Sequence, residues 1–186
     1  MQRIFLIGYM GAGKTTLGRL LAQRMHLDFI DLDHFIEARY RKKITDLFTE
    51  KGEEGFRRLE QIVLTEVSSF ENVIVSTGGG TPCFANNMQV MLQSGIVIYL
   101  KASAKSLFSR LVIAKSQRPL LSKLTDTALL DFIAENLAIR NPYYSQAHLT
   151  FNAEKLDNSQ QVYAAVDLLQ QTLSRTDLSI ILSEEA

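Results

Sequence analysis

The sequence of 186 residues, 46% of them hydrophobic and 22% charged, has the size and composition of one compact domain with a sizeable core. Lys plus Arg and Asp plus Glu number 20 each, so the zero net charge provides no electrostatic reason to expect nucleic acid or an anionic membrane as a partner. No apolar run approaches the roughly 18 residues of a membrane span. A small-molecule site therefore fits better, and we expect a monomer. Cys83 has no disulfide partner and no signal-peptide pattern opens the chain, which suggests the cytoplasm.

Short apolar runs alternate with longer helical patterns along the chain. The expected strands cover residues 3–8, 29–32, 73–76, 96–100 and 149–151. The expected helices cover residues 15–25, 34–41, 53–69, 86–93, 104–113, 127–139 and 159–173. This alternation predicts an α/β fold of three layers, α/β/α, around a five-stranded parallel sheet, with the ligand at the carboxyl ends of the strands. We expect residues 1–173 to form a single domain and residues 174–186 to form a C-terminal tail.

The clearest chemical signal is GYMGAGKT, residues 8–15, which matches the phosphate-loop pattern GxxxxGK[ST] between a predicted strand and a predicted helix. Backbone N–H groups of such a loop surround phosphate oxygens, Lys14 reaches the β- and γ-phosphates, and the Thr15 hydroxyl binds Mg²⁺. The expected nucleotide contacts here are Gly11, Ala12, Gly13, Lys14, Thr15 and Thr16. GTPases, ATPases and small-molecule kinases all have this loop, so it leaves the acceptor open.

Two carboxylates follow at the end of the second predicted strand, in the sequence Asp31-Leu32-Asp33. Alternation along a strand would point both side chains into the ligand crevice. One carboxylate would help to hold hydrated Mg²⁺, and the other would accept a hydroxyl proton or a hydrogen bond. The alternative is a plain strand end followed by a helix N-cap.

Arginines supply candidate anion contacts at three places. Arg57 and Arg58 lie on the predicted helix 53–69, four residues after Glu53 and Glu54, which fits either a salt-bridged surface or a clamp on an anionic acceptor. The expected core-facing residues of this helix are Phe56, Leu59, Ile62, Val63 and Val67.

The other two arginines lie later in the chain. Arg118, next to Pro119 in KSQRPLL, fits a mobile lid that stabilises a transferring phosphoryl group, or an ordinary exposed loop. Arg140 comes at the expected end of a helix, where the helix dipole favours a cation in any case.

Three consecutive glycines, Gly78, Gly79 and Gly80, follow the third predicted strand in VSTGGGTP. The triplet lacks the Lys-Ser/Thr pair of a second phosphate loop and no helix starts immediately behind it. We therefore expect it to be the exit of the strand, where missing side chains let the backbone approach the acceptor.

In their order along residues 3–172, GYMGAGKTT, DLD, FRRLE, STGGGT, RPLL and RNPYY resemble the shikimate kinase family. The resemblance implies a fold of the nucleoside-monophosphate-kinase type, with an acceptor-binding helical region at about 33–61 and a lid at about 113–125. It also implies transfer of the γ-phosphate of ATP, with Mg²⁺, to the 3-hydroxyl of shikimate in aromatic amino-acid biosynthesis. One departure is Arg41-Lys42, where the family commonly has a glycine.

The resemblance also implies roles for single residues. Asp33 would contact the shikimate hydroxyls as the candidate base, and Asp31 would hold Mg²⁺ through water beside Thr15. The implied shikimate site consists of Asp33, Phe48, Phe56, Arg57, Gly78, Gly79, Gly80 and Arg140, with the two arginines on the carboxylate. On the nucleotide side, Arg118 would act on the phosphates, and Arg110 and Pro119 would lie beside the adenine.

Two other functions remain open from the sequence. A related kinase, such as a gluconate kinase, has the same phosphate loop but should lack the FRR, GGG and RPLL set. A non-catalytic nucleotide-binding module has no reason to keep Lys14, Thr15, Asp31, Asp33 and Arg118 together. The three histidines, His26, His34 and His148, have no ligand spacing, so no zinc site is expected.

Overall fold

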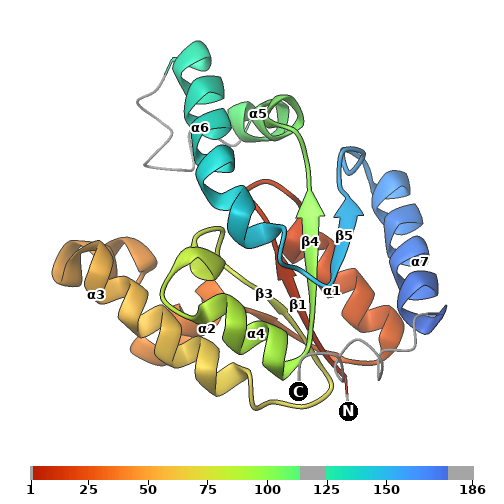
Figure 1. Ribbon diagram of the computed structural model, residues 1–186, viewed down its shortest axis with the longest axis horizontal. Helices are drawn as coiled ribbons and strands as arrows, with labels where there is room; N and C mark the ends of the chain where they lie inside the picture. Colours follow the sequence, from red (N-terminus) through yellow and green to blue (C-terminus); the bar gives the residue numbers. More distant parts are fainter. Residues whose placement is uncertain (1, 114–124, 176–186) are drawn as a thin grey trace.

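A computed structural model gives the structure of the chain and describes residues 2–113 and 125–175 (Figure 1). Five strands form one sheet in the order β2-β3-β1-β4-β5, and every neighbouring pair is parallel. The strands are β1 (Arg3–Ile7), β2 (Asp28–Asp31), β3 (Val73–Ser76), β4 (Ile96–Lys101) and β5 (Leu149–Asn152). The predicted α/β fold with a five-stranded parallel sheet is thus confirmed.

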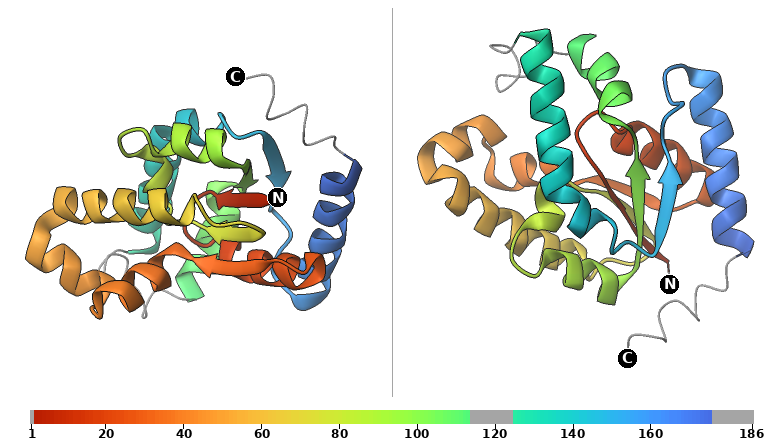
Figure 2. Two further views of the ribbon diagram at one scale, coloured as in Figure 1. Left: turned by 90° about the horizontal axis from the view of Figure 1, so that it is seen from below. Right: turned by 45° about the horizontal axis from the view of Figure 1, so that its top comes forward.

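Helices cover both faces of this sheet (Figure 2). They are α1 (Lys14–Met25), α2 (Leu32–Tyr40), α3 (Ile44–Val67), α4 (Asn87–Ser94), α5 (Ala104–Ile113), α6 (Asp126–Tyr144) and α7 (Ser159–Arg175), with a short 3₁₀ turn, η1 (Thr81–Cys83). Helices α1 and α7 pack side by side. In the described part of the chain, none of these helices is both long and apolar enough to cross a membrane.

The central strand β1 separates two hydrophobic cores. Ile4 and Leu6 belong to the core under α1 and α7, whereas Phe5 and Ile7 belong to the core under α3 and α4. All four side chains are fully buried. This is the expected result when successive side chains of a strand point to opposite faces and helices cover both.

The sheet order brings two loops together at its carboxyl edge. Strands β1 and β3 are neighbours, with Leu6 paired with Ser76, so the loops that follow them leave the sheet side by side. The chain then crosses to the other side of β1 to form β4. Loops that diverge in this way open a crevice at the edge of the sheet, and here the crevice lies between the phosphate loop and the glycine triplet.

Helix α3 consists of two helical segments joined by a kink. Gly52 interrupts the helix with a non-helical backbone (φ 68°, ψ 177°) that only glycine adopts readily, so the second segment starts after Gly52, as predicted for residues 53–69. The first segment, which begins at Ile44, was not predicted. Phe56, Val63 and Val67 are buried as predicted, whereas Ile62, also expected in the core, is 55% exposed.

The end of α6 also differs from the prediction, whereas α2 ends within one residue of its predicted end. Helix α6 continues through Pro142 to Tyr144, so Arg140 lies within the helix and not at its end. Helix α2 ends with Arg41 in the left-handed region (φ 52°), where the family pattern commonly has glycine. The Arg41 N–H group still caps the helix by donating to the Glu37 carbonyl.

Candidate active site

The phosphate loop joins β1 to α1. Gly13 holds the N-cap position of α1 with φ 93°, a backbone conformation that disfavours a side chain. The Lys14 side chain is buried and its Nζ atom donates to the carbonyls of Gly8 (2.7 Å) and Tyr9 (3.0 Å). The ammonium group is therefore held across the loop, where phosphate oxygens on the loop N–H groups would meet it.

Thr15 and Asp31 form the oxygen-rich corner of the site. The Thr15 hydroxyl donates to the Asp31 carboxylate at 2.7 Å, and both residues line the same cleft. Asp31 also caps α2 by accepting from the His34 N–H group. No group of three or more His, Cys, Asp or Glu side chains suited to a metal exists among the described residues. A hydroxyl with one nearby carboxylate fits Mg²⁺, which takes few protein ligands and keeps phosphates and waters.

The expected geometry of Asp33 is wrong, although its position at the cleft is correct. Strand β2 ends at Asp31, and Asp33 lies in the first turn of α2 rather than on the strand. Asp33 is exposed to solvent, and it lines the cleft beside the phosphate loop. Desolvation, Glu60 and Asp31 raise the pKa of Asp33 from 3.8 to about 6, against the lowering effect of Lys14 and Arg57. The carboxylates of Asp31 and Glu60 thus repel that of Asp33, and a divalent cation bound near them would reduce this repulsion.

Arg57 belongs to a buried ion pair that the sequence analysis missed. Its Nη1 atom lies 2.7 Å from Oε2 of Glu60, a carboxylate that is only 1% exposed. The Thr81 hydroxyl donates to the other carboxylate oxygen. The i,i+3 spacing of Arg57 and Glu60 in FRRLE is the sequence signal for this pair.

Two phenylalanines pack around the Arg57 guanidinium. The rings of Phe48 and Phe56 stack with their centroids 4.3 Å apart, and Arg57 Cζ lies 6.0 Å and 5.6 Å from these centroids. These cation–π contacts and the Glu60 ion pair fix the direction of the arginine from three sides. The surface pairs of the same helix differ, because Arg58 and Glu54 are both largely exposed.

The glycine triplet is required for space. Of the three, none has a positive φ, so backbone conformation does not explain them. A Cβ atom on Gly78 would lie 2.9 Å from Glu60 Oε1, and one on Gly80 would overlap the Arg57 guanidinium. The backbone of the triplet therefore lies directly against the Arg57–Glu60 pair.

Arg140 reaches the triplet from helix α6. A Cβ atom on Gly79 would lie 3.3 Å from Arg140 Nη1. The Arg140 Cζ atom lies 5.2 Å from the centroid of the Tyr9 ring, and Nη2 donates to Asn136 Oδ1 at 3.4 Å. Arg140 and Arg57, the two arginines that the family resemblance placed on the acceptor carboxylate, thus lie against consecutive glycines, 79 and 80.

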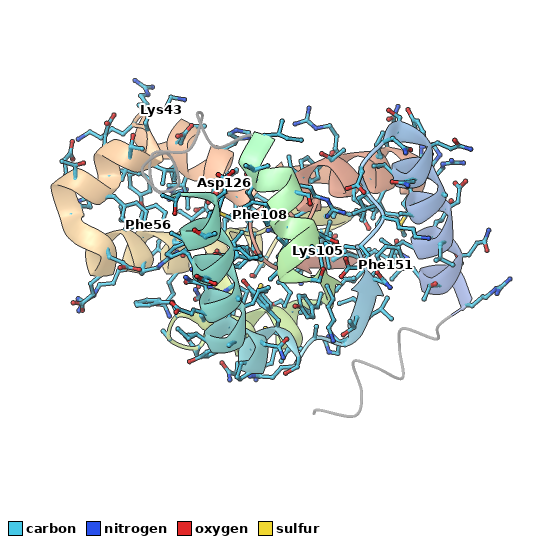
Figure 3. The ribbon with its side chains drawn as sticks, turned by 90° about the horizontal axis from the view of Figure 1, so that it is seen from above. Lys43, Phe56, Lys105, Phe108, Asp126 and Phe151 are labelled. Atoms are coloured by element: carbon cyan, nitrogen blue, oxygen red, sulfur yellow. The ribbon has the colours of Figure 1, made fainter. Side chains whose placement is uncertain are left out.

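The cleft itself has a volume of about 400 Å³. Figure 3 looks onto the carboxyl edge of the sheet, with α5 and α6 side by side and Phe56 on α3 to one side of them. The lining residues are Met10, Gly11, Gly13, Lys14, Thr15, Thr16, Asp31, Asp33, Ser76, Thr77, Gly78, Gly79, Arg110 and Leu156. Phe48, Phe56, Arg57, Gly80 and Arg140 are not in this lining and lie next to it, around the triplet.

Arg110 connects three parts of the site. Its guanidinium donates to the carbonyls of Gly11 (3.4 Å), Ala153 (2.9 Å) and Glu154 (2.8 Å) and pairs with Asp157 (2.9 Å). Leu156, from the same segment after β5, lines the cleft and was missed because nothing in its sequence context marks it. Arg118 and Pro119, in the expected lid, lie outside the described residues.

Comparisons with known proteins agree on one family. The family model described as shikimate kinase matches residues 10–170. The shikimate kinase of Phocaeicola vulgatus is 53% identical over 175 residues, 94% of this chain and 100% of that protein. The crystal structure of shikimate kinase from Bacteroides thetaiotaomicron superposes with a TM-score of 0.90 at 50% identity, over 93% of this chain and 98% of that one. Shikimate kinase from Acinetobacter baumannii in complex with shikimate gives 0.82 at 35% identity, over 95% and 96%.

Proposed function

This chain belongs to the shikimate kinase family, and we propose that it transfers the γ-phosphoryl group of ATP to the 3-hydroxyl of shikimate, a step of aromatic amino-acid biosynthesis. One observation supports this most strongly: Asp33 lines the cleft of the phosphate loop and also lies near the Arg57–Glu60 pair, since the charges of Lys14, Arg57 and Glu60 all act on its carboxylate. An acceptor held by the arginine would therefore present a hydroxyl to the carboxylate and to the phosphates at once. Geometry of this kind supplies most of the catalysis in phosphoryl transfer.

The nucleotide half of the site follows from the phosphate loop. The loop N–H groups of residues 11–16 would bind the α- and β-phosphates, and Lys14 would reach the β- and γ-phosphates. Thr15 would ligate Mg²⁺ directly, and Asp31 would hold it through water. Arg110 and Leu156 would border the nucleoside, and Arg118 and Pro119 would complete the site from the lid.

The acceptor half uses the triplet and its two arginines. Shikimate is a monoanion with three hydroxyls, and Arg57 and Arg140 would hold its carboxylate while Asp33 contacts its hydroxyls. Gly79 and Gly80 would bring the backbone against the ring, with Phe48 and Phe56 as apolar walls. An uncharged sugar would bring no carboxylate to either guanidinium group.

The transfer step then follows from these positions. A bond forms between the 3-hydroxyl oxygen and the γ-phosphorus, and the bond from that phosphorus to the β,γ-bridging oxygen breaks. The hydroxyl proton passes to the Asp33 carboxylate. Mg²⁺ held by Thr15 and Asp31 would supply positive charge to the phosphates, and Lys14 would add a fixed charge beside them.

The activity test compares three reactions by coupled ADP release: ATP with shikimate, with gluconate and with no acceptor. We expect turnover with shikimate alone. Turnover only with gluconate would assign the chain to a different kinase activity, and no turnover with any acceptor would favour a nucleotide-binding module.

The acceptor clamp has a separate test in Arg57→Ala, with Arg58→Ala as the matched surface control. Arg57→Ala should raise the KM for shikimate far more than the KM for ATP, because Arg57 lies on the acceptor side of Asp33. Arg58→Ala should leave both values unchanged. Equal effects of Arg57→Ala on both substrates would show that the clamp is assigned to the wrong residue.

The wider organisation completes the proposal. Residues 1–173 would act as a single monomeric kinase domain in the cytoplasm, with residues 33–61 binding the acceptor and residues 113–125 closing as a lid. Gel filtration at micromolar concentration tests the monomer, and a dimer peak there would contradict it.

A further inference from the structure

Tyr144 makes a contact that the transfer mechanism does not use. It lies in the last turn of α6 and is fully buried, and its hydroxyl donates to the Gly79 carbonyl at 2.5 Å. Its ring packs against Tyr99 with a centroid distance of 5.0 Å. A tyrosine that only filled the core would need no hydroxyl, so the position of this group requires an explanation.

The same hydroxyl lies near Arg140, one helical turn earlier. The positive charge of Arg140 partly offsets the rise in the pKa of Tyr144 that burial causes. Both side chains lie close to Gly79, because its carbonyl accepts from Tyr144 and a Cβ atom built on it would lie 3.3 Å from Arg140 Nη1. Helix α6 thus presents two side chains to the middle glycine of the triplet, and Tyr144 is hydrogen-bonded to it.

Tyr9 contacts Arg140 from the phosphate loop. Its ring is 1% exposed and lies 5.2 Å from Arg140 Cζ, while its backbone carbonyl accepts from Lys14. The Arg140 guanidinium therefore has Tyr9 against it, Asn136 at one nitrogen and Tyr144 nearby. An arginine restrained in this way loses little conformational freedom when it binds an anion.

We propose that Tyr144 is a positioning residue for the acceptor: its hydroxyl ties Gly79 to helix α6 and thereby fixes Arg140 where the acceptor carboxylate binds. This rests on the proposed function, in which Arg140 binds that carboxylate. Without the hydroxyl, the Gly79 carbonyl loses its donor and the triplet is free to move relative to Arg140. Acceptor binding should weaken, and nucleotide binding should not.

Tyr144→Phe tests this, with Tyr143→Phe as the matched control because Tyr143 is the preceding residue and 37% exposed. We expect Tyr144→Phe to raise the KM for shikimate about 3- to 10-fold, the effect of one lost hydrogen bond, with the KM for ATP unchanged. Tyr143→Phe should change neither value. An unchanged KM for shikimate, or an equal rise for both substrates, would overturn the proposal.

A double-mutant cycle separates positioning from a general loss of packing. In an Arg140→Ala background, Tyr144→Phe should add less than 2-fold to the KM for shikimate, because its effect acts largely through Arg140. If Tyr144→Phe raises the KM for shikimate by the same factor with and without Arg140, the proposal is overturned. If Tyr144→Phe does not fold, Asn136→Ala removes another described contact of Arg140. This variant should also raise the KM for shikimate without changing the KM for ATP, by a smaller factor than Tyr144→Phe.

The results for Arg140→Ala and Tyr144→Phe together tell whether the proposed function fails or only the role of Tyr144. If Arg140→Ala alone leaves the KM for shikimate unchanged, the carboxylate clamp is assigned wrongly and the positioning role fails with it. If Arg140→Ala raises this KM but Tyr144→Phe does not, the proposed function stands and only the role of Tyr144 is refuted. Thermal unfolding of each variant confirms that the comparison is made on folded protein.

Discussion

The Thr15 hydroxyl donates a hydrogen bond to the Asp31 carboxylate at 2.7 Å, and this contact joins the start of α1 to the start of α2. Thr15 is the second residue of α1 and Asp31 is the last residue of β2, so the contact exists only because β1, β3 and β2 follow one another across the sheet. It places a hydroxyl and a carboxylate where a hydrated cation would bind.

Asp31→Asn should therefore raise the Mg²⁺ concentration that gives half-maximal activity by about 10-fold, the usual effect of losing a residue that orients a metal ligand. The amide keeps the size of the side chain but removes its charge. Activity measured against MgCl₂ at saturating ATP and shikimate tests this. An unchanged magnesium requirement would remove Asp31 from the metal site.

Asp33→Asn should lower kcat by about 10² to 10⁴-fold, the range attributed to a positioned general base. The amide cannot accept the hydroxyl proton, although it still forms hydrogen bonds. A loss of less than about 10-fold would instead mean that Asp33 only orients the acceptor. The coupled ADP-release assay at saturating ATP and shikimate measures kcat of both proteins.

Asp33 should also make folding stability depend on pH. Its pKa is raised in the folded protein from 3.8 to about 6, so the folded state binds the proton more tightly and its stability falls as the pH rises from about 4 to 6. Asp33→Asn removes this cost and should be more stable than the natural chain at pH 7.5, with the difference shrinking towards pH 4. Solvent in the open cleft screens the effect to about 1 kcal/mol.

Urea unfolding of both proteins in magnesium-free buffer at pH 4.5, 6 and 7.5 measures this difference. Magnesium is left out because a bound cation would stabilise the ionised carboxylate. A stability difference that stays constant across these three pH values would show that the pKa of Asp33 is not raised in the folded state.

Glu60→Ala should destabilise the protein by about 3 kcal/mol, since removal of one member of a buried ion pair leaves the other charge without its partner. Glu60 is 1% exposed and Arg57 is 18% exposed at the side chain, so some of the cost is relieved by solvent at the arginine. The variant should also raise the KM for shikimate, because Arg57 loses its orientation. Glu54→Ala, in the exposed pair with Arg58, is the control and should shift stability by under about 0.5 kcal/mol.

Gly80→Ala should raise the KM for shikimate more than Gly79→Ala does, with little change in the KM for ATP. The added methyl group at residue 80 overlaps the Arg57 guanidinium, whereas at residue 79 its nearest neighbours lie 3.3 Å away. Steady-state kinetics of both variants give the comparison. If the KM for ATP rises instead, the triplet belongs to the nucleotide half of the site.

The sequence alone determined the parts of this protein whose chemistry is local. Residues 8–15 combine the glycines, the lysine and the threonine of a phosphate loop within eight positions, and alternating strand and helix patterns predicted the parallel sheet. The order of the motifs indicated the family that the comparisons then confirmed. Helix boundaries were less accurate: Asp33 proved to be helical and α6 passed through Pro142, because packing outweighed the local preferences.

Only the tertiary structure decided which distant residues meet. Glu60 accepts from Thr81 across 21 residues, and Tyr144 donates to Gly79 across 65, and neither separation follows a local period. These contacts depend on how β1 and β3 pair and on how α3 and α6 pack beside them. Periodicity and capping act over a few residues along the chain, whereas the contacts of Thr81 with Glu60, Tyr9 with Arg140 and Tyr144 with Gly79 join segments that only the folded sheet brings together.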